Sequence, residues 1–200
     1  MRTILYLTAF FILAIDIAGC FFHPAYETTA GQLHTGIPGY DYAVLPKKAV
    51  WNFLEEQQDT TDPNFPYKAT HAVANGLFHT ENRRISLFEN WIMWLAGKFY
   101  EPLSHTLNSK LIISGGAGNC TDRTQVLMDI YKHCGLGSRI IALNGHVSME
   151  VFFKGSWRIT DPDFDLVFNG GIDSINSIEG NHFTDSVLSK KGFSKQHLYL

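Results

Sequence analysis

Cysteine is scarce in this chain, with only Cys20, Cys120 and Cys134 among its 200 residues. So small and odd a number excludes a disulfide framework. Cys120 and Cys134 are 14 residues apart on one predicted helix, which separates them by about 21 Å. A disulfide needs Cα atoms within about 7 Å. Cys134 is therefore interpreted as a small core residue.

Charge is also low. Charged residues make up 18% of the chain, and the formal net charge is −3. Basic residues form only isolated pairs, so we expect no nucleic-acid partner. Hydrophobic residues make up 45% of the chain, which predicts a folded protein. The length fits one domain, with or without a tail.

Motifs for metals and nucleotides are missing as well. No Cys-x-x-Cys or His-Glu-x-x-His occurs, and the glycine-rich run at 115–118 lacks the residues that complete a phosphate loop or a dinucleotide fingerprint. We expect neither a metal nor a cofactor. A zinc site is a weak alternative, and it would combine Cys120, His133, Cys134 and His146. Three other histidines are interpreted as surface or core residues: His71, His79 and His105.

The N-terminal segment indicates an export signal. Arg2 precedes an apolar run at 4–15, which is too short for a membrane span of about 20 residues. The sequence Ile17-Ala18-Gly19-Cys20 resembles a bacterial lipobox, and this resemblance implies cleavage before Cys20 and lipid attachment to it. We therefore expect a signal peptide at 1–19 and a membrane-anchored lipoprotein of the bacterial cell envelope. A soluble signal peptide, or an uncleaved anchor through Phe22, is the alternative.

The next part of the chain indicates a tether followed by helices. Residues 20–45 carry glycine and proline without a helical period. Pro46 predicts the start of a helix to about residue 58, and further helices are predicted over about 67–78 and 84–99. A loop of small residues follows at 114–118. The apolar stripe of the third helix is interpreted as core packing: Ile85, Phe88, Trp91, Ile92, Leu95 and Phe99.

The pattern changes after this loop. A helix is predicted over 119–134, capped by Gly135. Strands are predicted at 139–143, 146–153 and 157–161, with a turn at 154–156. This order predicts an α+β fold in which N-terminal helices and a Cys-bearing helix pack on an antiparallel sheet. We expect one domain over residues 46–200.

Three residues in this region have the chemistry of a nucleophilic site. Cys120 falls at the first turn of its helix, where the dipole and free N–H groups favour a thiolate and an oxyanion. His146 begins a strand and Asp161 ends the next. If Lys154 and Gly155 form a two-residue hairpin loop, Asp161 and His146 are diagonal neighbours on one face, about 7–8 Å apart. A three-residue loop would place them on opposite faces.

Four motifs resemble the transglutaminase-like superfamily over about residues 110–165. They are Gly118–Arg123, Cys134–Arg139, Gly145–Val151 and Gly155–Pro162. The resemblance implies a papain-like core in which Cys120 is the nucleophile, His146 the base and Asp161 the orienting acid.

Some features depart from the family pattern. Val147-Ser148 stands where the family often has Ala and then Trp, and the gap from Cys120 to His146 is short. Asp163 and Asp165 are rivals of Asp161 for the acid role. The upstream oxyanion donor is not placed, and the candidates for it are Trp91, Trp94 and Tyr100.

The expected activity is thiolate attack on an amide or related acyl carbon, through a thioester acyl-enzyme. Hydrolysis, as in a protease or amidase, is favoured over transfer to an amine. The export signal implies a peptide, protein or cell-wall or surface-polymer amide as the substrate. The alternatives are a non-catalytic envelope module that binds peptide or polymer, and an arylamine acyltransferase, which the export signal disfavours.

Overall fold

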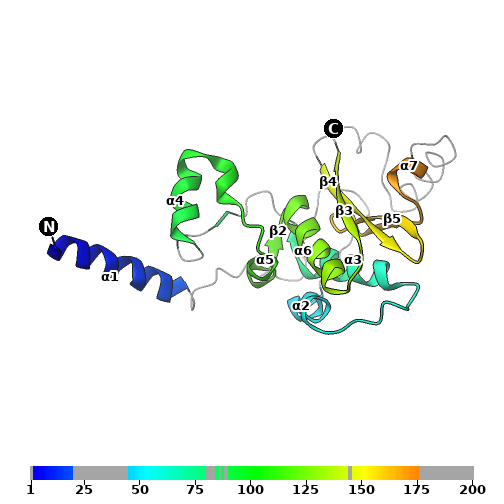
Figure 1. Cartoon of the computed structure of the whole chain (residues 1–200), viewed down its shortest axis with the longest axis horizontal. Coiled ribbons are helices and arrows are strands. Elements are labelled where there is room, and N and C mark those ends of the chain that lie inside the picture. The colour runs from blue at the N-terminus through cyan, green and yellow to red at the C-terminus, as the bar shows by residue number, and fades with distance from the viewer. Residues whose placement is uncertain are drawn as a thin grey trace.

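The computed structural model describes residues 2–19, 45–79, 84–85, 87, 90–143 and 146–175. Over these residues the chain is an α+β fold with seven α-helices and a four-stranded antiparallel sheet (Figure 1). The predicted lipid attachment residue Cys20, the rest of the tether to residue 44 and residues 176–200 lie outside the described part.

The first helix, α1 (Arg2–Gly19), covers the predicted signal sequence. Most of its described large apolar side chains are exposed, and they include Ile4, Leu7, Phe10 and Phe11. Among the described helices, none has the length and hydropathy that a membrane span requires.

Four helices make up the layer that packs with the sheet: α2 (Lys47–Glu55), α3 (Phe65–Gly76), α5 (Ser109–Gly115) and α6 (Cys120–His133). Pro46 precedes α2 and Pro66 lies in the first turn of α3, positions where proline costs no intrahelical hydrogen bond. Both helices therefore begin close to the predicted residues.

The sheet has the order β3 (Ser138–Leu143), β4 (His146–Phe153), β5 (Ser156–Asp161) and β6 (Leu166–Phe168), and each strand is antiparallel to its neighbour. Lys154 and Gly155 form a two-residue turn with φ angles of 50° and 82°, the left-handed conformation that a tight hairpin requires. Phe153 pairs with Ser156, so the loop has two residues, which is one of the two lengths that the sequence leaves open.

The core lies between α6 and β4. Val126, Leu127, Ile130 and Tyr131 on one face of α6 are fully buried, as their spacing predicts. They join a single cluster with the buried face of β4, contributed by Met149, Val151 and Phe153. Gly135 has a φ of 71° and ends the helix in the left-handed conformation, also as predicted.

The expectation that residues 84–99 form a core helix is correct only in part, since a helix is present from residue 91 but does not join the core. The helix α4 spans only Trp91–Phe99, because the Asn90 side chain accepts the N–H of Met93 and starts it there. None of its residues is buried, and Phe99 is 87% exposed. α4 packs on the short 3₁₀ helix η1 (Glu101–Ser104) and stands away from the sheet (Figure 1). The α4–η1 unit therefore lies outside the core.

The small-residue loop predicted at 114–118 is wrong too. Its first two residues end α5, Gly116 turns with a φ of 73°, and Ala117–Gly118 form β2. This strand pairs in parallel with β1 (Phe78–His79), with His79 beside Gly118. The segment is buried and is part of the framework that fixes the start of α6.

Candidate active site around Cys120

The start of α6 is held by a capping box. The Asn119 side chain accepts the N–H of Asp122 at 3.0 Å, and the Asp122 carboxylate accepts the N–H of Asn119 at 3.2 Å. Gly118 lies so close that a Cβ there would be 2.5 Å from the Cβ of Asp122. Cys120 and Thr121 supply the remaining first-turn N–H groups, which the box does not use. The helix therefore presents free donors next to the Cys120 sulfur.

Cys120 contacts β4 through its sulfur. Burial alone would raise the pKa of this thiol, but hydrogen bonds from the His146 side chain and the backbone of Val147 lower it below its usual 9.0. The Thr124 hydroxyl donates to the carbonyl of Val147 at 3.1 Å and so ties the first turns of α6 to β4. Thiolate is thus favoured at a half-buried site that remains partly open to solvent.

His146 and Asp161 are brought together by the hairpin register. Nε2 of His146 donates to Oδ2 of Asp161 at 2.7 Å. The other carboxylate oxygen of Asp161 accepts the N–H of Asp163 at 2.9 Å and of Phe164 at 3.2 Å. The Phe164 ring lies 5.0 Å from the imidazole, centroid to centroid. Because Nε2 is occupied by Asp161, we infer that Nδ1 is the nitrogen that faces Cys120.

The electrostatics of His146 favour its charged form. Burial alone would lower its pKa, but the hydrogen bonds with Asp161 and Cys120 and the charges of Asp161 and Asp163 raise it from 6.5 to about 10. A lowered thiol pKa and a raised imidazole pKa both favour the thiolate–imidazolium pair over the neutral pair. This pair is the reactive form of a cysteine nucleophile.

Asp163 and Asp165, the rivals of Asp161, each contact a different histidine. Asp163 accepts from Nδ1 of His79 at 2.6 Å, and Asp165 contacts Nδ1 of His71 at 2.9 Å. Three aspartates at alternate positions of the β5–β6 turn therefore contact three histidines from different elements. Only Asp161 contacts the histidine that hydrogen-bonds to Cys120.

Arg123 forms a buried ion pair with Asp163. Its Nη1 lies 2.8 Å from Oδ1 of Asp163, and its Nη2 donates to the carbonyl of Ala74. Arg123 is 1% exposed. Burial alone would raise the pKa of Asp163, but His79 and Arg123 lower it below its usual 3.8. Sequence reasoning assigned no role to His79 or Arg123, and no motif indicates the contacts that they make here.

The remaining candidates do not join this site. Cys134 ends α6 and packs against the core, where burial raises its pKa. Within the described residues no group of three or more His, Cys, Asp or Glu side chains could hold a metal ion. The suggested oxyanion donors Trp91, Trp94 and Tyr100 belong to α4 and its C-cap, which pack on η1.

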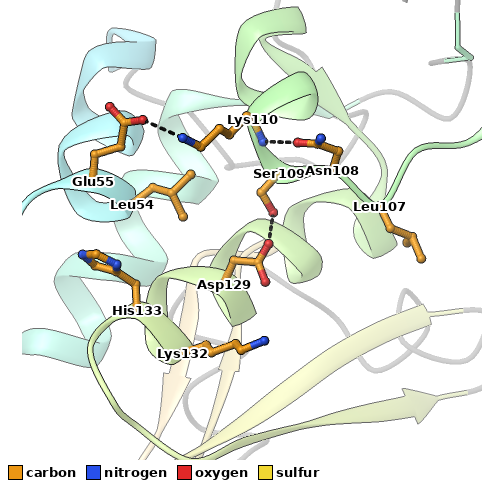
Figure 2. Close-up of a pocket in the computed structure, with 9 residues that line it drawn as sticks. All are labelled: Leu54, Glu55, Leu107, Asn108, Ser109, Lys110, Asp129, Lys132 and His133. Carbon is orange, nitrogen blue, oxygen red and sulfur yellow. Dashed lines mark hydrogen bonds and ion pairs between the residues drawn. The ribbon is translucent and has the colours of Figure 1, made fainter. Parts of the chain in front are cut away.

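Two depressions border α6 at opposite ends. One, of about 1100 Å³, is lined by the C-terminal half of α6 with α2 and α5 (Figure 2). Two pairs of its polar side chains interact: Lys110 with Glu55 at 3.1 Å and Ser109 with Asp129 at 2.6 Å. It lies about nine or more residues along the helix from Cys120, hence about 14 Å or more away. The other depression lies at the N-terminal turn that carries Cys120.

Comparisons of the chain with protein-family models, with curated proteins and with solved structures find no match.

Proposed function

We propose that this protein is a transglutaminase-like cysteine enzyme of the bacterial cell envelope that hydrolyses amide or peptide bonds. The observation that carries the proposal is the continuous contact from the Cys120 sulfur to His146 and on to Asp161. The order and spacing of the four motifs support a papain-like arrangement of the core. The N-terminal signal pattern and Cys20 support export and a lipid anchor.

The first half of the reaction is acylation. The Cys120 thiolate attacks the acyl carbon, and the carbonyl oxygen becomes an oxyanion next to the N–H of Cys120. This attack forms the C–S bond. The C–N bond then breaks, and the imidazolium of His146 gives its proton to the leaving amine. Asp161 keeps the ring oriented and stabilises its charge, because its Oδ2 accepts from Nε2 at 2.7 Å.

The second half is deacylation. Neutral His146 takes a proton from water, the hydroxyl oxygen attacks the thioester carbon, and the C–S bond breaks to restore the thiolate. An amine in place of water would give transfer instead of hydrolysis. In both halves the protein groups that act are Cys120, His146 and Asp161.

Acylation by p-nitrophenyl acetate tests the proposal. We expect a burst of one p-nitrophenolate per chain and an acetyl thioester on the peptide that contains Cys120, located by mass spectrometry. Cys120→Ser and His146→Ala should abolish the burst. Cys134→Ser serves as the matched control and should retain it. A non-catalytic binding module would instead acylate Cys120 and Cys134 slowly and equally.

A further inference from the structure

An apolar groove of about 770 Å³ lies beside the N-terminal turn of α6. Its walls come from four parts of the chain: Met93 of α4, Leu103 of η1, Leu111 of α5 and Thr121 of α6. Most of the exposed surface of the lining is apolar, although polar residues, among them Glu101 and Asp122, also contribute to it. Leu103 and Leu107 at its rim are 39% and 67% exposed, so the groove is open to solvent.

The groove adjoins the proposed nucleophile. Asn119, Thr121 and Asp122 line it, and these residues flank Cys120 in the same helical turn. The N–H groups of that turn are the ones that would donate hydrogen bonds to an oxyanion. A substrate whose carbonyl lies at these donors therefore extends an adjoining group towards the groove.

We propose that this groove binds a bulky apolar group, an aliphatic or aromatic side chain or acyl chain, that adjoins the carbonyl attacked by Cys120. The inference rests on the proposed function and adds a substrate class to it. It also accounts for α4, an apolar helix that buries none of its residues in the core. The depression in Figure 2 is lined mainly by polar side chains, and two pairs of them already interact: Lys110 with Glu55 and Ser109 with Asp129.

Acyl chain length provides the test. We compare acylation of the full chain by p-nitrophenyl hexanoate and p-nitrophenyl acetate, whose intrinsic reactivities are similar. Burial of four additional methylenes should make hexanoate at least about tenfold faster. Met93→Ser should reduce this hexanoate-to-acetate ratio about fivefold. Ile92→Ser is the matched control, because Ile92 is the neighbouring residue, is 59% exposed and does not line the groove.

A second variant covers the case in which Met93→Ser fails to fold. Thr121 is exposed at the edge of the groove, and Thr121→Trp should reduce the ratio by occupying the space. A ratio near one in the natural protein, or equal ratios in Met93→Ser and Ile92→Ser, overturns the groove assignment while the proposed function stands. Absence of any acetyl adduct on Cys120 overturns the proposed function itself.

Discussion

Replacing His146 by alanine should change the pH dependence of Cys120 reactivity. In the natural protein, hydrogen bonds from His146 and Val147 outweigh burial and lower the pKa of the thiol. The variant loses the larger of these bonds and the imidazolium charge. The thiol pKa should therefore rise back towards its usual 9.0.

The magnitude follows from the thiolate fraction. A thiol with a pKa of 9.0 is about one part in a thousand thiolate at pH 6 and about one half at pH 9, so its rate changes about 500-fold. The pKa of Cys120 in the natural protein lies below that value, so its thiolate fraction should change less over the same interval and its profile should be flatter. Taking the ratio within each protein removes differences in intrinsic nucleophilicity.

The assay is alkylation by iodoacetamide at a series of pH values, followed for each cysteine peptide by mass spectrometry. Cys134 provides an internal control, because burial raises its pKa and its profile should be steep in both proteins. A Cys120 profile in the natural protein as steep as the one in His146→Ala would show that His146 does not lower the pKa of the thiol.

Three further predictions concern the supports of the site. Asp161→Asn removes the main charge that raises the pKa of His146 from 6.5 to about 10, so this pKa should fall by about 1–2 units in an NMR titration; an unchanged value would show that Asp161 is not the partner. Gly118→Ala should lower the free energy of unfolding, measured in urea, by about 1–3 kcal/mol, because the added Cβ would meet the side chain of Asp122 in the capping box. Gly137→Ala is the control, because a Cβ there has no close neighbour, and it should cost less than about 1 kcal/mol. Arg123→Met should cost about 3–5 kcal/mol, because it leaves a buried carboxylate without its cation, and a near-neutral result contradicts the role given to that pair.

The parts of the site that depend on local sequence were predictable. The Asn119 cap is specified by residues within one turn, and the hairpin register by the two residues of its loop. Once that register is known, the period of two places Asp161 on the face of His146. The sequence alone left a three-residue loop open, because Lys154, with its positive φ of 50°, is not a residue that favours this conformation.

Contacts between distant segments were not predictable in the same way. β1 has two residues, too few to show any period, and it pairs with β2, which lies 39 positions later. His79 is therefore placed by a pairing that no local pattern indicates. For α4, the period predicted a face packed in the core, whereas no residue of this helix is buried. Periodicity reports amphipathic character, and the neighbouring elements decide burial.

The β5–β6 turn shows why the acid could not be identified from motif position alone. Three carboxylates at alternate positions repel one another unless each is paired, and here His146, His79 and His71 pair with them in turn. Asp163 favours the charged form of His146 but opposes a thiolate at Cys120. Its own pairing with Arg123 reduces that opposition, since the buried cation balances the charge. Arg123 therefore has an electrostatic effect on the nucleophile that it does not touch. Removing it should raise the pKa of Cys120 as well as destabilise the fold.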